Sequence, residues 1–539
     1  MSAFSTIIKT TTDTNNDEMD KPIKKKSKKS LPSSLITIFE TPDGERAGAP
    51  IDLPLLTNAK QIEQLVNTLL NNDEALPYAM YVNGIEIQSS VEDTLLLSLD
   101  DNNNNKLSLD TISEDTLKIV YQPLSVFRVR PVTRCVESMP GHTEAILHIS
   151  YSPDGSCLAS GGGDMTVRFW NVQTSMPMYT CTGHRHHVLC TTWAPNGLAF
   201  ASSDKSGEIR IWDPKTGKPK LSTPLRGHTK WVTFLCFEPL HSDPTCRRLA
   251  SSSKDNSIKI WNVHSGRLET TISGHVDSVE CIKWGGTGLL YTASRDRTIK
   301  VWAIDGHGYS QQKLVRTLSG HAHRINSLAM NCDYVLRTGA HQLGIKDKSM
   351  KVSRNNTIIA AQPNDNPDTL KAREELKNIA LERYTSVVGN TGNGEKLVSG
   401  SDDFTLIIWS PQDNKNPLMR LTGHQQLINH IAFSPDGRYF ASASFDKKVK
   451  IWCGLTGRFL NTLTGHVQSV YQVTWSADSK FIVSASKDST LKIWNVKDPK
   501  KAMNTLSGHM DEIYALDWSP DGTQCASGSK DRMIKIWKH

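Results

Sequence analysis

Most of the chain repeats one pattern of apolar and polar positions. Runs such as 166–170 and 491–494 alternate β-branched or aromatic residues with polar ones and end in tryptophan. Alternation with period two predicts β-strands that bury one face. Turn sequences of the type Ser-Pro-Asp-Gly, as at 152–155 and 519–522, separate the runs. Residues 141–539 are therefore predicted to form a series of short antiparallel strands.

A Gly-His pair precedes each tryptophan-ended stretch, and this unit occurs eight times. The pairs are Gly141-His142, Gly183-His184, Gly227-His228, Gly274-His275, Gly320-His321, Gly423-His424, Gly465-His466 and Gly508-His509. The tryptophans are Trp170, Trp212, Trp261, Trp302, Trp409, Trp452, Trp494 and Trp537. This spacing resembles the WD-repeat pattern and predicts one four-stranded blade per unit, hence an eight-bladed β-propeller. A further pair, Gly306-His307, has no tryptophan of its own and is predicted to be loop.

Aspartate and a hydroxyl residue recur at fixed distances from these tryptophans. The aspartate stands six residues before the tryptophan in every unit but the second, where Ser206 occupies the position. The hydroxyl residues, ten before, are Ser160, Ser202, Ser251, Thr292, Ser399, Ser442, Ser484 and Ser527. Asp, His and Ser also form hydrolase triads, but a catalytic site occurs once and this set recurs. We interpret it as the structural Asp-His-Ser-Trp network of WD repeats.

The propeller is predicted to close through a segment that precedes it. The chain stops two residues after Trp537, which leaves the last unit one outer strand short. An open strand edge is a liability for unwanted pairing. Residues 126–134 occupy the place of an outer strand before the first Gly-His pair, so we expect them to pair with the last blade.

Two units contain insertions. The third has a short one at 239–248, and the fifth has a long one at about 341–394. Within the long insertion, residues 369–386 place apolar side chains broadly on one side and predict a helix. Such a helix either docks a partner or packs back on the propeller as a lid. We favour the docking role slightly.

The amino-terminal part contains a lysine-rich tail and a small domain. Residues 1–33 are too polar to bury a core and are predicted to be disordered. Their cluster of lysines favours a nuclear localisation signal over a solvated tail: Lys21, Lys24, Lys25, Lys26, Lys28 and Lys29. Residues 34–124 show a hairpin, a helix at 58–71, a second hairpin around Asn83-Gly84 and a last strand at 116–121. This order predicts a small α+β, ubiquitin-like (β-grasp) domain, with Asn102–Asn105 as a low-complexity loop.

Charge divides the chain into parts with different expected partners. Residues 34–124 hold fifteen acids and four bases, and residues 1–33 hold seven lysines and four acids. Because the whole chain is +7, the propeller carries +15. Part of this excess flanks the network positions, which favours contact with RNA or an acidic protein surface over an ordinary solvated rim. The candidate contacts are Arg185, His186, Lys230, Trp231, Lys254, Arg295, Arg297, Arg324, Lys487, Lys530 and Arg532.

Composition excludes several other classes. No apolar run is long enough to span a membrane, and the start is too polar for a secretory signal. Ten cysteines without CxxC spacing indicate reduced core residues. The chain has no Gly-rich phosphate loop, metal-ligand cluster or singular nucleophile–base pair, so we expect no enzymatic activity.

The whole arrangement resembles the Notchless family of ribosome-assembly factors. The matching segments include Leu76–Tyr78, Val82–Ile87, Tyr121–Pro123 and Phe127–Arg130. The resemblance implies a role in maturation of the large ribosomal subunit, in the nucleus and nucleolus. It implies that the propeller docks on pre-ribosomal rRNA and proteins, as a monomer within a larger particle.

The resemblance also assigns one residue to a partner's metal. In that family the ubiquitin-like domain docks on the metal-ion-dependent adhesion site of Midasin, a large AAA ATPase. A carboxylate completes the magnesium shell there, since hard cations prefer oxygen ligands. The matching position is Glu86, one acid among fifteen in its domain. The chain is expected to hold no cofactor of its own and to share magnesium at that interface.

Two other function classes remain as alternatives. A WD-repeat adaptor in ubiquitin or Notch signalling is one, although no F-box-like helical motif is visible. An enzyme built on the propeller is the other, and the absent catalytic constellations argue against it.

Overall fold

The computed structural model describes residues 34–41, 46–70, 78–82, 85–87, 90–100, 116–123, 129–304, 313–341, 367–390, 394–496 and 502–539. The lysine tail with its predicted nuclear signal, Asn83-Gly84, Asn102–Asn105 and Gly306-His307 lie outside these residues. The chain divides into two compact units, Met1–Leu124 and Ser125–His539.

The first unit is a ubiquitin-like domain built on one five-stranded sheet. Its elements are β1 (Ser34–Glu40), β2 (Ile51–Pro54), α1 (Ala59–Leu69), β3 (Tyr78–Val82), β4 (Ile85–Glu86), α2 (Val91–Asp100) and β5 (Leu117–Pro123). The strand order is β2-β1-β5-β3-β4, and β1 pairs with β5 in parallel. Apolar side chains of α1, such as Ile62 and Val66, are fully buried against this sheet. The domain thus has its own core.

Helix starts in this unit follow from local capping. The Asn58 N–H donates to Gln61 Oε1 at 3.0 Å, one half of a capping box at the start of α1. Ser90 Oγ accepts the Asp93 N–H at 3.2 Å and donates to the Asp93 carboxylate at 2.8 Å. The segment from Val91, to which the sequence pattern assigned no element, is therefore a capped helix.

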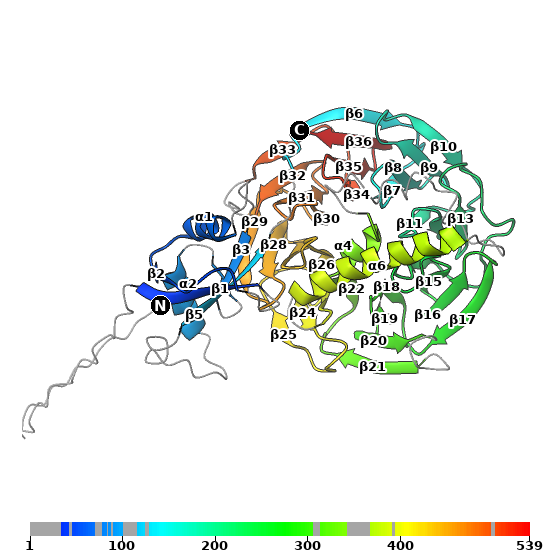
Figure 1. Cartoon of the computed structure of the whole chain (residues 1–539). Coiled ribbons are helices and arrows are strands. Elements are labelled where there is room, and N and C mark those ends of the chain that lie inside the picture. Colours follow the sequence, from blue (N-terminus) through cyan, green and yellow to red (C-terminus); the bar gives the residue numbers. More distant parts are fainter. Residues whose placement is uncertain are drawn as a thin grey trace, which may run out of the picture. The chain divides into compact units, whose positions relative to one another are not determined.

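The second unit contains eight sheets, one for each Gly-His unit, and is an eight-bladed propeller as predicted (Figure 1). Blade one contains β7 (Ile146–Tyr151), β8 (Cys157–Gly162), β9 (Val167–Asn171) and β10 (Pro177–Cys181), and blade two contains β11 (Val188–Trp193), β12 (Phe200–Asp204) and β13 (Ile209–Trp212). Blade three contains β14 (Val232–Phe237), β15 (Arg248–Ser253), β16 (Ser257–Asn262) and β17 (Arg267–Ser273). Blade four contains β18 (Val279–Trp284), β19 (Leu289–Ser294), β20 (Thr298–Ala303) and β21 (Lys313–Ser319). Blade five contains β22 (Ile325–Met330), β23 (Leu397–Ser401), β24 (Leu406–Trp409) and β25 (Met419–Leu421), and blade six contains β26 (Ile428–Phe433), β27 (Tyr439–Ser444), β28 (Lys448–Cys453) and β29 (Phe459–Thr464). Blade seven contains β30 (Val470–Trp475), β31 (Phe481–Ser486), β32 (Leu491–Asn495) and β33 (Asn504–Leu506). Blade eight contains β34 (Ile513–Trp518), β35 (Gln524–Ser529), β36 (Met533–Lys538) and β6 (Arg134–Pro140).

The first strand of each blade lies innermost, and neighbouring inner strands contact one another around the whole ring, β34 and β7 included. Blade two has three named strands, and its outer edge is formed by the isolated bridges of Ile209 with Leu225 and Trp212 with Pro219. Prolines at 219 and 224 lack the N–H that a continuous outer strand needs.

The ring closes through β6, which pairs antiparallel with β36 from Met533↔Pro140 to Lys538↔Arg134. Closure by the amino-terminal segment is confirmed, but the predicted strand at 126–134 is wrong in position. Pro131 has no N–H to donate, so the ladder starts only after it. Val132 is instead fully buried beside blades seven and eight.

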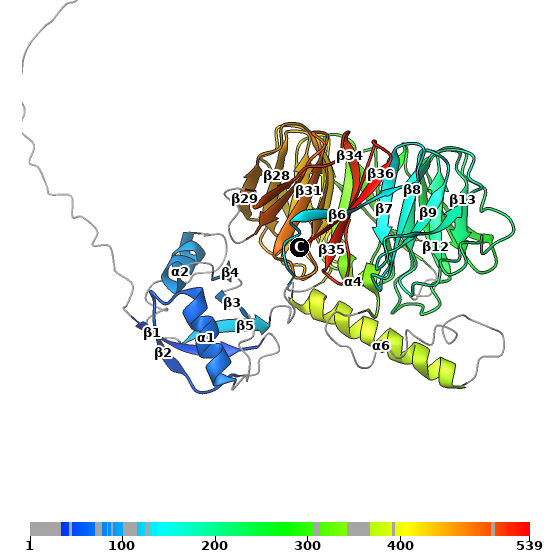
Figure 2. The ribbon, with the colours of Figure 1, turned by 90° about the horizontal axis from the view of Figure 1, so that it is seen from above.

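The long insertion of blade five occupies the connection between β22 and β23, residues 331–396, and so begins before the predicted residue 341. It contains α4 (Asp333–Thr338) and α6 (Pro367–Asn390), which includes the predicted helix. Helix α6 runs along one face of the propeller (Figure 2). Ala380 and Tyr384 are buried against blades two to five, so this helix packs as a lid on that face. Among the described residues, no helix is long and apolar enough to cross a membrane.

Candidate functional site

The histidine, hydroxyl residue, aspartate and tryptophan of each blade form one hydrogen-bonded network. In blade one, His142 Nε2 lies 2.8 Å from Ser160 Oγ, and Trp170 Nε1 donates to the same oxygen at 3.0 Å. His142 Nδ1 lies 2.9 Å from Asp164 Oδ2, which also accepts the Thr143 N–H at 3.1 Å. Burial raises the pKa of Asp164, but hydrogen bonds from His142 and other donors outweigh burial and hold that pKa below its usual range. The carboxylate thus fastens the Gly-His loop to the turn.

The same network recurs in the other seven blades, where the distance from His Nδ1 to an aspartate Oδ2 is 2.7 to 3.1 Å. The structural interpretation of these residues is therefore confirmed. Each carboxylate is committed to backbone and imidazole donors rather than to a substrate.

Blade two completes its network with a different aspartate. His184 Nδ1 lies 3.1 Å from Asp204 Oδ2, two positions earlier in the chain than in the other blades. Ser206 donates to Asp204 Oδ1 from its N–H at 2.9 Å and from its hydroxyl at 2.6 Å. Burial opposes ionisation, but the bonds from His184 and Ser206 lower the pKa of Asp204 to about 2. The second unit does depart from the aspartate spacing, as the sequence shows, but it keeps the network because Asp204 supplies the carboxylate two positions earlier.

Each network aspartate bonds to the loop that follows its Gly-His pair, so turn and loop lie at the same end of the blade. We call the surface made by these eight turns and eight loops the network face. All eleven basic or aromatic residues predicted to bind RNA or an acidic protein lie in these turns and loops. Their binding role stays a prediction.

Five of these side chains pair with acids on the same face. The pairs are Arg185 with Glu208, Arg295 with Asp277, Arg324 with Asp402, Lys487 with Glu512, and Lys530 with Asp511, at 2.5 to 3.8 Å. Partly exposed pairs of this kind add little stability. They do neutralise part of the charge that the sequence pattern had counted as available.

On the network face, two lysines contact the side chain of Trp231. Its indole is 39% exposed. Lys205 Nζ lies 4.4 Å from the ring centroid, and Lys254 Nζ lies 4.7 Å from it. Both lysines thus make cation–π contacts with one exposed ring. Lys205 was missed from sequence because its closeness to Trp231 depends on the neighbouring blade.

The opposite face carries the insertion. The Glu395 carboxylate is 1% exposed and accepts hydrogen bonds from Tyr384 on α6, from Tyr291 and from the Gly286 N–H of blade four. Residue Gln412 of blade five also donates to it, at 3.1 Å. This buried acid joins the helix to two blades, and its long-range partners gave no sequence signal.

Helix α4 spans the central channel. Asp333 pairs with Lys283 of blade four at 3.0 Å, and Arg337 pairs with Asp517 of blade eight at 2.8 Å. The inner strands and α4 line a cavity of about 460 Å³ that has both polar and apolar side chains in its wall. Because blades four and eight lie on opposite sides of the ring, the helix braces the channel.

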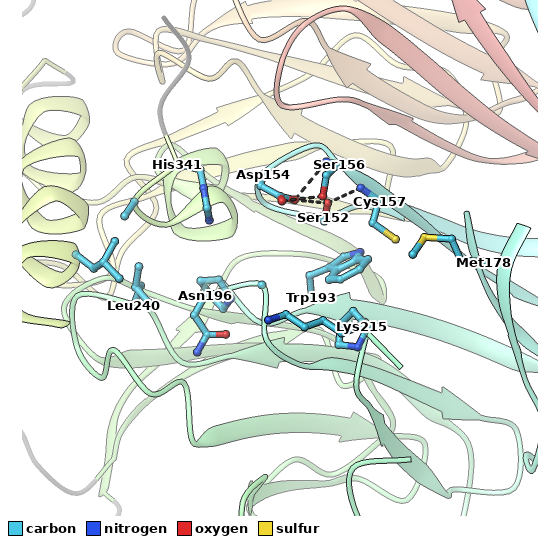
Figure 3. Close-up of a pocket in the computed structure, with 15 residues that line it drawn as sticks. Ser152, Asp154, Ser156, Cys157, Met178, Trp193, Asn196, Lys215, Leu240 and His341 are labelled. Atoms are coloured by element: carbon cyan, nitrogen blue, oxygen red, sulfur yellow. Dashed lines mark hydrogen bonds between the residues drawn. The ribbon is translucent and has the colours of Figure 1, made fainter. Parts of the chain in front are cut away.

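A smaller cavity of about 190 Å³ lies between blades one and two and the insertion (Figure 3). Its groups do not form a catalytic set. Ser152 donates to Asp154 at 2.6 Å, Ser156 donates to it at 2.7 Å, and Asp154 therefore has a lowered pKa despite its burial. Burial raises the pKa of Cys157 to about 12, which keeps this thiol protonated.

Glu86 lies on β4, the edge strand of the ubiquitin-like sheet, in register with Tyr81 of β3. Its side chain is half-buried. A carboxylate oxygen is the donor that magnesium prefers, so the residue fits the expected role chemically. Its role as a metal ligand stays a prediction.

Comparisons with known proteins decide the family. A profile described as "NLE (NUC135) domain" matches residues 35–95, and "WD domain, G-beta repeat" matches 133–171, 175–213, 218–262, 266–303, 415–453, 457–495 and 500–538. "Protein Notchless" of Drosophila melanogaster is 50% identical over 394 residues, 73% of each chain. The chain belongs to the Notchless family. "Ribosome assembly protein 4" of Saccharomyces cerevisiae is 41% identical over 448 residues, 80% of each chain.

Two further comparisons concern the fold of this Notchless-family chain. The repeat profile skips the fifth blade, where the insertion separates β22 from β23. The crystal structure of the computationally designed Ika8 protein aligns with a TM-score of 0.54 and 22% identity, covering 75% of this chain and all of that one. This likeness concerns the fold alone.

Proposed function

We propose that the protein is a non-enzymatic assembly factor for the large ribosomal subunit. The observation that carries the proposal is family membership across both units together with the name of the yeast relative, "Ribosome assembly protein 4". The propeller contributes a rigid scaffold, since its eight networks and closed ring leave little freedom within a blade. It docks on the pre-ribosome, on rRNA and proteins, as a monomer within a larger particle.

The ubiquitin-like domain engages the metal-ion-dependent adhesion site of a Midasin-type AAA ATPase. Glu86 supports this proposal because it stands on the edge strand of the described sheet, where a partner can reach it. Magnesium shared at the interface supplies a hard, oxygen-seeking centre for the carboxylate. The ATPase then pulls on the domain, and force passed to the propeller remodels the particle and releases the factor.

The propeller's chemistry supports a scaffold rather than an enzyme. The Asp-His-Ser sets are used eight times over in holding blades together. The exposed basic residues of the network face are instead suited to binding. We therefore propose that the protein acts in the nucleus and nucleolus, to which the Lys21–Lys29 cluster directs it.

A gradient experiment tests the function and Glu86 together. Tagged wild-type protein and Glu86→Ala are purified from sucrose gradient fractions, and the bound RNA and proteins are identified. Both should sediment with large-subunit precursors, whereas the substitution should lower recovery of the ATPase and block release. Asp52→Ala is the matched control, an exposed carboxylate on β2 at the other edge of the same sheet.

The outcomes separate the alternatives. Recovery of ubiquitin ligase subunits or a receptor tail, without precursor rRNA, would move the protein to the adaptor class. Normal release of the Glu86→Ala protein would leave the assembly role and remove the carboxylate assignment.

A further inference from the structure

Blade two differs from the other blades in residues that gather at one place on the network face. The residue after Gly-His is Arg185 here, and the residue before the next Gly-His is Arg226; no other unit has a basic residue at either position. Four residues before its tryptophan the blade has Glu208, where five other units have serine or threonine. These are three departures from one repeat, and they lie around one pocket.

The displaced aspartate makes room for this arrangement. In five of the other blades the hydroxyl four residues before the tryptophan donates to the network aspartate, as Thr166 does in blade one at 2.8 Å. In blade two Ser206 supplies that hydroxyl to Asp204. Only the backbone of Glu208 still bonds to Asp204: its N–H donates to the Asp204 carboxylate at 3.1 Å, and its carbonyl accepts the Asp204 N–H at 3.1 Å. Its side chain is free to serve another purpose without loss of the network.

Glu208 holds two arginines side by side at the surface. Its Oε1 accepts Arg226 Nε at 2.8 Å and lies 3.5 Å from Arg185 Nε, and Arg210 lies 3.9 Å from Oε2. The carboxylate is 8% exposed, whereas the Arg185 and Arg226 side chains are 67% and 56% exposed. Three guanidinium groups and one carboxylate leave a local charge of +2. The pocket they share with Ser206 and His228 has a volume of about 240 Å³.

A fixed pair of outward-facing guanidinium groups is suited to a phosphate, because their planar N–H forks match its oxygens. Without Glu208 the two like charges would repel and separate. We propose that this cluster, the blade-two clamp of Arg185, Arg226 and Glu208, binds a backbone phosphate of single-stranded RNA.

The neighbouring Trp231 cluster is the reason to choose RNA over a phosphorylated peptide. Lys205 precedes Ser206 in the turn and contacts the Trp231 ring. Gly207, at φ +93°, presses that turn against the loop of blade three, where a Cβ would come within 2.9 Å of the Lys230 carbonyl oxygen. Lys205 and the exposed Trp231 indole thus form a second cationic site, next to the turn that carries the clamp. Successive phosphates with a base to stack on tryptophan fit both loci, whereas a single phosphoserine fills one.

This inference rests on the proposed function, because it names the propeller's contact with rRNA. It is tested with purified full-length protein and a fluorescein-labelled single-stranded RNA, by fluorescence anisotropy at several salt concentrations. Arg185→Ala/Arg226→Ala should weaken binding about 10-fold or more, and Trp231→Ala about 5-fold or more. The slope of log K against log salt should fall by about 1.4 in the double variant, for two lost cations.

The control is Lys218→Ala/Arg267→Ala, which removes two exposed cations at the opposite end of blades two and three, outside the predicted binding residues. It should change binding less than about 2-fold, because charges far from the site are screened. Equal weakening by control and clamp variants would overturn the proposal, as would unchanged binding in a clamp variant with wild-type melting temperature. Preference for a phosphoserine peptide over RNA would also overturn it. If any of these results is found while the wild-type protein still co-sediments with large-subunit precursors, the clamp is wrong and the assembly role stands. If the wild-type protein does not co-sediment with precursors, the assembly role itself is wrong.

Discussion

The hydroxyl of Tyr384 on α6 donates a 2.9 Å hydrogen bond to Oε1 of Glu395. Glu395 is a buried carboxylate that stands just before β23, where the insertion leads back into blade five. Glu395 also accepts from Tyr291 Oη at 2.7 Å and from the Gly286 N–H at 2.6 Å. Burial, and after it the negative charge of Glu395, raise the pKa of Tyr384 and of Tyr291, so both phenols stay protonated as donors. One carboxylate thus fixes the lid helix to the propeller.

Removing this bond should loosen the helix more than the ring. Tyr384→Phe keeps the ring stacked on His241 but loses the donor, at a cost of about 1–2 kcal/mol to docking of α6. Hydrogen exchange should quicken along α6, while the inner strands keep wild-type protection. Thr385→Ala, an exposed neighbour on the same helix, serves as the control. Faster exchange in all blades would contradict a local role.

Blade two should depend on Asp204 as the other blades depend on their own aspartates. Asp204→Asn replaces one of the two acceptor oxygens with an NH2 donor and removes the charge, so either His184 or the donors of the turn lose their acceptor and the unfolding free energy should fall by about 3 kcal/mol. Ser206→Ala removes one hydroxyl donor and should cost about 1 kcal/mol. Asp255→Asn in blade three is the comparison. Denaturant titration measures all three, and a larger loss for Ser206→Ala would reverse the assignment.

The closing strand should be required for a stable monomer. A chain that starts at residue 141 lacks β6 and exposes the edge of β36, so it should melt at lower temperature and associate. A chain that starts at residue 129 keeps β6 together with Val129, whose N–H donates to Asp478 at 3.1 Å. Thermal melting with size-exclusion chromatography distinguishes them. If the shorter chain stayed monomeric with the same melting temperature, strand closure would not be what stabilises the ring.

The features that sequence predicted well are those that repeat. The Gly-His pair with a downstream tryptophan occurs eight times, and this count predicted the number of blades. The network residues followed for the same reason. The aspartate of blade two, Asp204, was not identified from sequence, because a fixed spacing cannot show that a turn carboxylate two positions away reaches the same histidine.

A repeated spacing cannot predict contacts between residues that are far apart in the sequence. Helix α4 is held across the channel by ion pairs with Lys283 and Asp517, which lie far from it in the sequence. The hydrogen bond between Tyr291 and Glu395 likewise joins residues about a hundred positions apart. Of the predicted binding residues, sequence placed all on one face but could not show which of them pair with acids. Arg226 was missed because its role arises only from its contact with Glu208.

Two histidines of the central channel should give the propeller a distinct dependence on pH. Burial lowers the pKa of His148 to about 4, with Asp517 opposing and Arg337 adding to the shift. Burial also lowers the pKa of His430 to about 4, with Lys283 and His148 adding to it. His148 Nδ1 lies 2.7 Å from Thr191 Oγ1, so its neutral ring is part of the folded structure.

Between pH 6.5 and 4 the unfolded chain binds protons on these histidines and the folded chain does not, so unfolding free energy should fall as pH drops through that window. The loss is at most about 3 kcal/mol for each histidine. His148→Gln keeps a hydrogen-bonding group for Thr191 but cannot titrate, so it should lose about half of this dependence in urea titrations across the window. His186→Gln, exposed on the network face, should change nothing. The network aspartates, whose pKa values are lowered, act separately, since their contribution is lost only as pH falls below about 4. An unchanged slope in His148→Gln would assign the loss to other groups.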